Sequence, residues 1–249
     1  MSTASRPRKT PVKDRVCRDS ARTTVVMTGF GPFPGVPVNA TMLLVPRLAV
    51  AARAAFPDTR IVCEILPTEW RAAPQRVDRL LATHQPDLVL HFGVSGRARG
   101  FEIETRGHNV CAMAPDAAGR TPGKPLIAEG GALRLPARVP VAAIVRRLRQ
   151  RRIPAFQSWS AGDYLCNATL YHVLAATTGS ACEAGFIHIP SLLAPPGRSH
   201  MAGAPLRCSP GCPMNWQQAL EGALEIVAAC LGRNSPRVVK SAPAFARHG

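Results

Sequence analysis

The sequence predicts an α/β fold, a three-layer α/β/α sandwich around a mostly parallel mixed sheet. Two observations support this prediction. Short apolar runs rich in β-branched residues alternate along the chain with longer segments whose apolar residues recur at helical spacing. One of the runs, at residues 87–94, is almost continuously apolar, which is typical of a strand buried on both faces.

Strands and helices are expected in turn along the chain. The predicted strands cover residues 24–28, 60–66, 87–94, 153–159 and 185–189. The predicted helices cover residues 40–56, 68–84, 139–152, 166–177 and 216–231. Asn39 can cap the first helix, and Pro46 predicts a kink or an early boundary inside it. Residues 95–138 lack periodicity, and a loop of that length is usually functional or hides a small hairpin.

Charge is unevenly distributed over the 249 residues. The net charge of +16 would ordinarily indicate a nucleic acid or an anionic membrane as a partner. Residues 1–22 carry seven basic and two acidic side chains, residues 134–152 carry seven Arg, and residues 233–249 carry four basic groups. These three segments account for the whole net charge, so the remainder is neutral.

This distribution predicts a basic flexible tail at 1–22, a single domain at 23–232 and a second basic tail at 233–249. Binding of nucleic acid is disfavoured because residues 134–152 contain no aromatic side chain on which bases could stack. A solvated helix face is the preferred interpretation of the arginines at 146–152. The chain has no apolar stretch long enough for a membrane span and no secretory signal, so we expect no membrane contact and a cytoplasmic location.

Eight cysteines occur, and without an export signal most are expected to be reduced and packed in the core. Cys208 and Cys212 are four residues apart, but a zinc site would need a second pair of ligands. His200 is the only nearby candidate, so two free thiols are the preferred interpretation.

Three residues in loops or at element ends could carry chemistry. Cys166 would open a helix after a glycine-containing turn, where the helix dipole favours a thiolate and free N–H groups could hold an oxyanion. His188, in an apolar strand, is either a satisfied core histidine or the base for Cys166. Glu104 could orient His188, although a surface ion pair with Arg106 is the preferred interpretation when Glu104 is taken in isolation. From these residues alone, a structural cysteine and a cysteine hydrolase both stay open.

Several motifs in series resemble pyroglutamyl-peptidase I, a family of cysteine peptidases. The similar segments are TGFGPFPGVPVN at 28–39, LPT at 66–68, HFGVSGR at 91–97, ETRGHN at 104–109, AGDYLCN at 161–167 and GFIHIP at 185–190. They follow one another in the family's order and cover roughly residues 23–231. Blocks in series are far more specific than any one of them.

The resemblance implies an α/β/α fold and removal of an N-terminal pyroglutamate from peptides, without metal or cofactor. It implies Cys166 as nucleophile, His188 as general base and then acid, and Glu104 as the orienting carboxylate. It also implies a small apolar pocket for the lactam ring, and a dimer or tetramer. The residues that match the pocket are Phe30, Phe33, Thr68, Tyr164 and Leu165.

The chain departs from the family pattern at two places. Val94 stands where many bacterial members have Gln, and Ala114 lies where some place an Arg near the catalytic site. The leading hypothesis is therefore a cysteine peptidase that cleaves the amide bond after a pyroglutamyl residue through a thioester. The alternatives are a diverged relative that acts on another amide, and a basic protein that binds anions or nucleic acid.

Overall fold

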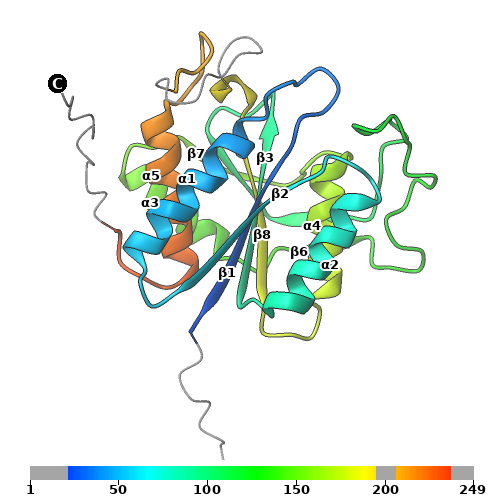
Figure 1. Cartoon of the computed structure of the whole chain (residues 1–249), viewed down its shortest axis with the longest axis horizontal. Coiled ribbons are helices and arrows are strands. Elements are labelled where there is room, and N and C mark those ends of the chain that lie inside the picture. Colours follow the sequence, from blue (N-terminus) through cyan, green and yellow to red (C-terminus); the bar gives the residue numbers. More distant parts are fainter. Residues whose placement is uncertain (1–21, 195–205, 237–249) are drawn as a thin grey trace, which may run out of the picture.

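The computed structural model describes residues 22–194 and 206–236. Its main feature is a six-stranded sheet with helices on both faces (Figure 1). The sheet strands are β1 (Thr24–Phe30), β2 (Arg60–Leu66), β3 (Leu88–Ser95), β4 (Phe101–Glu104), β7 (Ala155–Ser158) and β8 (Glu183–Pro190). The helices are α1 (Ala40–Ala55), α2 (Ala72–His84), α3 (Val141–Gln150), α4 (Leu165–Ala176), α5 (Trp216–Cys230) and the short η1 (Ser191–Leu193).

The order of strands across the sheet is β2-β1-β3-β8-β4-β7. The strands from β2 to β8 run parallel, whereas β4 runs antiparallel to β8 and parallel to β7. The predicted fold class, a three-layer sandwich around a mostly parallel mixed sheet, is confirmed. The carboxyl ends of β1, β3 and β8 meet at one edge, where sites form in sheets of this kind.

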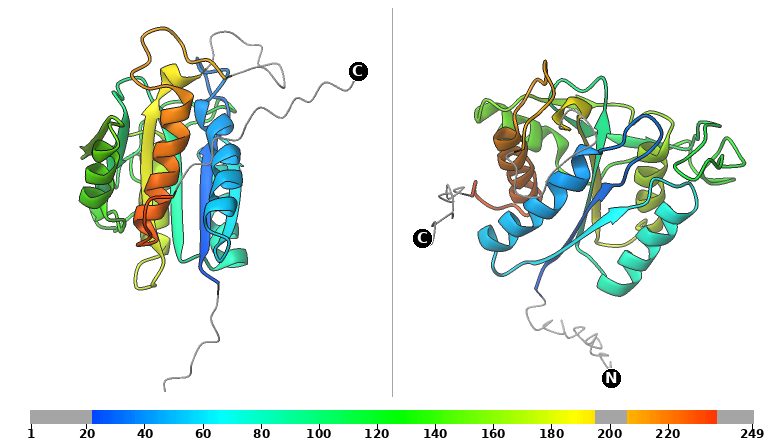
Figure 2. Two further views of the ribbon diagram at one scale, coloured as in Figure 1. Left: turned by 90° about the vertical axis from the view of Figure 1, so that its left-hand side faces the viewer. Right: turned by 45° about the horizontal axis from the view of Figure 1, so that its top comes forward.

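Helices α1, α3 and α5 cover one face of the sheet and α2 and α4 cover the other. Figure 2 shows α1 and α5 side by side on the first face. Because side chains alternate along a strand, β8 contributes to both cores: Ile187 packs beneath α1 and α5, and Phe186 packs beneath α2 and α4. Both side chains are fully buried.

Most of the expected elements form, with two corrections. Asn39 caps α1 through a hydrogen bond from Thr41 N, but the early boundary expected at Pro46 is wrong, since the helix continues to Ala55. Residues 95–138 contain β4 as well as a small two-stranded antiparallel sheet of β5 (Arg106–His108) and β6 (Arg134–Pro136). The sequence pattern did not reveal that β4 belongs to the main sheet.

The arginine face of α3 is not simply solvated, and that expectation is corrected. Glu225 on α5 is buried, and the side chains of Arg147 and Arg151 pair with its two carboxylate oxygens at 2.5 and 3.0 Å. A buried carboxylate requires such partners. Two of the basic charges of this segment therefore serve packing between α3 and α5.

Other expectations fall largely outside the described residues. The tails predicted at 1–22 and 233–249 lie mostly there, as does His200. Within the described part, Cys208 and Cys212 are free thiols. None of the described helices is long and apolar enough to cross a membrane.

Candidate active site

A cavity of about 800 Å³ opens at the carboxyl edge of the parallel strands. Its lining comes from several elements: the end of β1, the loop after β2, the end of β3, the residue pair Glu102 and His188, and the first turn of α4. Segments far apart in sequence meet here because their strands are neighbours in the sheet.

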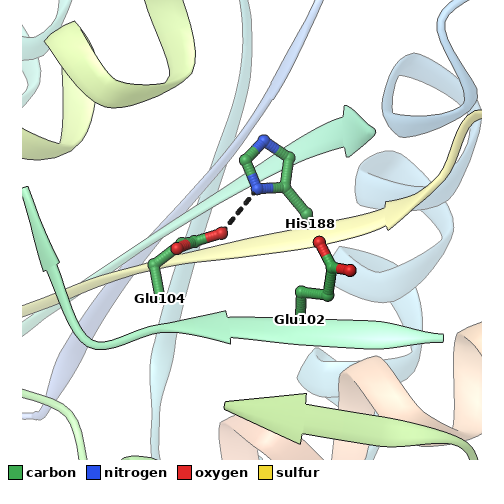
Figure 3. Close-up of side chains that lie close together, drawn as sticks. All are labelled: Glu102, Glu104 and His188. Carbon is green, nitrogen blue, oxygen red and sulfur yellow. Dashed lines mark hydrogen bonds and ion pairs between the residues drawn. The ribbon is translucent and has the colours of Figure 1, made fainter. Parts of the chain in front are cut away.

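His188 and Glu104 form a buried pair beside this cavity. The Nδ1 atom of His188 lies 2.8 Å from Glu104 Oε1, and Glu104 is fully buried (Figure 3). The pair forms because β4 is antiparallel to β8 and sends its glutamates toward the histidine. The expected surface pairing of Glu104 with Arg106 is therefore wrong; the guanidinium of Arg106 lies 4.9 Å from the centre of the Trp159 ring instead.

Cys166 occupies the first turn of α4, directly after Leu165. Gly162 turns the preceding loop with a φ of 81°, and no described side chain caps the helix. The N–H groups in the first turn of a helix have no partner within the helix, and they lie at the positive end of the helix dipole. In α4 this end of the helix lies at the cavity. Cys166 is only half-buried and lines the cavity.

The histidine is held in a charged environment. Burial opposes protonation of His188, but the neighbouring Cys166 and Glu104 outweigh it and raise the pKa of the imidazole to about 10. An imidazole with this pKa is protonated at neutral pH. The arrangement can therefore supply a nucleophile, a proton donor and an oxyanion site within one cavity.

All five residues predicted to contact a lactam ring line the same cavity: Phe30, Phe33, Thr68, Tyr164 and Leu165. The rings of Phe33 and Tyr164 lie 6.4 Å apart between centres. The Tyr164 hydroxyl donates to Pro115 O and the Thr68 hydroxyl donates to Gly31 O, which fixes both side chains. Phe30 is almost fully buried and also packs on Phe186.

Comparison with known proteins identifies the family. A family model described as pyroglutamyl peptidase matches residues 23–227. The chain belongs to the pyroglutamyl peptidase family. The family's members are omega peptidases, and the motif resemblance in the sequence is confirmed.

Pyroglutamyl peptidase relatives are found among both sequences and solved structures. A pyrrolidone-carboxylate peptidase of Thermococcus onnurineus is 36% identical over 67% of this chain and 82% of its own length. Pyrrolidone-carboxylate peptidase 1 of Ralstonia nicotianae is 37% identical over 72% of this chain and 85% of its own. The crystal structure of Bacillus amyloliquefaciens pyroglutamyl peptidase I superposes with a TM-score of 0.71 at 26% identity, covering 85% of this chain and 98% of that one.

The two departures from the pyroglutamyl peptidase pattern have different settings. Val94, near the end of β3, lines the cavity. Ala114 accepts a hydrogen bond at its carbonyl oxygen from Trp70 Nε1, at 2.9 Å. The loop at Ala114 is further anchored by Asp116, whose carboxylate accepts hydrogen bonds from the backbone N–H groups of Trp70, Ala118 and Arg120.

Sequence reasoning missed three residues that shape this site. Asn167, next to Cys166, is fully buried and joins α4 to the β5 region through three hydrogen bonds to the backbone of His108 and Val110. Gly93 lies opposite His188 in the pairing of β3 with β8. Glu102 lines the cavity beside His188. A useful signal for Glu102 was its spacing of two from Glu104, which puts both on one face of a strand.

Glu102, Glu104 and His188 also bring one ligand atom each within 4.8 Å of the others, a spacing that suits a cation. The Nδ1 atom and one Glu104 oxygen already share a hydrogen bond. The pair therefore suits proton transfer more directly than metal binding.

Proposed function

We propose that this protein is a cysteine peptidase that hydrolyses the amide bond after an N-terminal pyroglutamyl residue. One observation carries the proposal: His188, which the buried Glu104 holds through a hydrogen bond, and the half-buried Cys166 line one cavity from a strand and a helix start. Membership of the pyroglutamyl peptidase family supports the substrate class.

In the proposed reaction, the Cys166 thiolate attacks the carbonyl carbon that follows the lactam ring. The resulting oxyanion is stabilised by the free N–H groups at the start of α4. His188 then donates its proton to the leaving amine, the C–N bond breaks, and a thioester remains on Cys166.

Deacylation reverses the proton path. His188 accepts a proton from water, the hydroxyl attacks the thioester carbonyl, and the C–S bond breaks to release pyroglutamic acid and the thiolate. Glu104 holds the ring through Nδ1, which directs Nε2 toward the reacting groups and stabilises the imidazolium.

The lactam ring is neutral and flat, and a pyroglutamyl peptide has no free α-amine. The part of the cavity lined by Phe30, Phe33 and Tyr164 suits such a ring because it offers apolar faces. Thr68 and Leu165 complete this side of the proposed ring site.

Release of a chromophore from a pyroglutamyl amide tests the proposal. We expect wild-type activity and a loss of at least about a thousandfold in kcat/KM for Cys166→Ser. Cys63→Ser is the matched control, since Cys63 is also a half-buried free thiol but lies on β2 outside the cavity. Activity that survives in Cys166→Ser would overturn the mechanism, and an inactive wild type would favour a relative with another amide substrate.

The wider assignments belong to the same proposal. We infer a single domain over residues 23–232, a cytoplasmic location and a homo-oligomer, dimer or tetramer. Size-exclusion chromatography with light scattering tests the assembly, and limited proteolysis tests the domain boundaries.

A further inference from the structure

Glu102 is a second carboxylate beside the proposed catalytic histidine. In the antiparallel pairing of β4 with β8, Glu102 lies directly opposite His188. Its side chain leaves β4 on the same face as Glu104, and both point toward the histidine (Figure 3). Glu104 is fully buried, whereas Glu102 is half-buried and lines the cavity.

The order of the strands sets a direction along the cavity. The residues of the proposed lactam site lie toward β1 and β2, Gly93 and His188 follow on β3 and β8, and Glu102 comes last on β4. His188 must protonate the leaving amine, so the leaving residue extends from the histidine toward β4. The cavity, about 800 Å³, has room for this residue beyond a five-membered ring.

The charges around this end of the cavity favour a cation. Besides His188, the charged side chains of its lining are Glu102, Asp163 and Arg97. Asp163 and Arg97 are exposed, where water and salt screen their charges, whereas Glu102 is half-buried. Within the described residues no ion pair engages the Glu102 carboxylate, which leaves it available to a substrate.

We propose that Glu102 is a specificity-determining residue that selects substrates with a cationic side chain, Lys or Arg, directly after the pyroglutamyl residue. This inference rests on the proposed function, because it assigns the leaving-group side of the same site. The neighbouring groups agree with it, because Glu104 places a second carboxylate behind the histidine.

Isosteric substrates separate charge from size. We would measure kcat/KM at about pH 8 and low salt for pyroglutamyl-X amides in which X is Lys, norleucine, Glu or Gln. Because the C-terminus of each substrate is an amide, the side chain of X is the only group whose charge differs among the four substrates. The wild type is expected to prefer Lys over norleucine by about fivefold to tenfold, and Gln over Glu by a similar factor, as for a partly screened charge pair.

The Glu102→Gln variant is expected to bring both ratios to within about twofold of one. Glu129→Gln is the control, because Glu129 is an exposed acid outside the cavity and should leave the ratios at their wild-type values. Arg97→Gln should increase the preference for Lys. A uniform fall for all four substrates in Glu102→Gln, with unchanged ratios, would show action through His188 alone and would overturn the inference.

Failure of the proposed function is distinguishable from failure of this inference. A wild type that cleaves none of the four amides contradicts the proposed function. A wild type that cleaves all four at equal rates contradicts the role of Glu102 only. If Glu102→Gln does not fold, wild-type protein still decides: raising the ionic strength from about 0.01 M to about 1 M should reduce the Lys preference, and a salt-independent preference overturns the inference.

Discussion

Replacement of Gly93 by alanine tests how tightly the site is built. Gly93 lies on β3 opposite His188. A β-carbon at this position would lie 2.7 and 2.8 Å from two ring carbons of Phe186 and 3.1 Å from Cys166 Sγ. Carbon atoms in normal contact are about 3.5–4.0 Å apart, so the ring or the strand must move by roughly 1 Å.

The Phe186 ring has no free space into which it could move. Phe186 is fully buried, and its ring packs against Phe30 and His188 at centroid distances of 6.1 and 4.9 Å. Overpacking of a core costs about 1–3 kcal/mol, and a misplacement of about 1 Å at a reacting group costs up to about a hundredfold in rate. We therefore expect Gly93→Ala to lose about 2 kcal/mol of stability and about tenfold to a hundredfold in kcat/KM.

Urea unfolding and hydrolysis of a pyroglutamyl amide, measured on the same preparation, check both numbers. Gly31→Ala is the matched control, because the nearest described heavy atom to its new β-carbon would be Leu66 O at 3.6 Å, an ordinary contact. A Gly93→Ala enzyme with kcat/KM within twofold of the wild type would refute the argument that Gly93 fixes the spacing of Cys166 and His188.

Two further predictions concern buried groups away from the reacting atoms. Burial lowers the pKa of His91 to about 3, so the unfolded chain takes up a proton near pH 6.5 while the folded chain does not. Stability should therefore fall as the pH drops below 6.5, and by pH 5 the wild type should lose about 2 kcal/mol more than His91→Gln in urea unfolding; parallel curves for the two proteins would contradict this. Glu225→Gln should cost about 1–3 kcal/mol because Arg147 and Arg151 lose their shared partner. Glu221, a partly exposed acid on the same helix, supplies the control. If Glu225→Gln lowers the stability measured by thermal unfolding no more than Glu221→Gln does, this account is contradicted.

Elements with strong local patterns could be predicted from the sequence. The strand predicted at 60–66 coincides with β2, and the helix predicted at 216–231 ends one residue beyond α5. Both segments have apolar residues in a pattern that one element alone explains. Cys166 and His188 could be predicted as candidate catalytic residues in the same way, because the helix start at Cys166 and the strand end near His188 are local features.

Residues whose environment is set by distant pairing could not be predicted in this way. Glu104 has the local context of a surface acid, and only the pairing of β4 with β8 buries it against His188. Glu225 has the same ambiguity on α5, and it is buried because two arginines of α3 neutralise it. In both cases a distant partner offsets the desolvation of a carboxylate, and a single sequence does not specify that partner.

The short strand β4 also limits how this part of the chain can vary in length. Its side chains alternate between the two faces of the sheet, so a shift of one residue against β8 would present Ile103 to His188 and turn both Glu102 and Glu104 away. The start of the strand is equally constrained, because a side chain at Gly100 would collide with the backbone of Pro154. Insertions before β4 are therefore tolerated only where the loop absorbs them completely, and a deletion of one residue inside the strand would remove both carboxylates from the site in a single step.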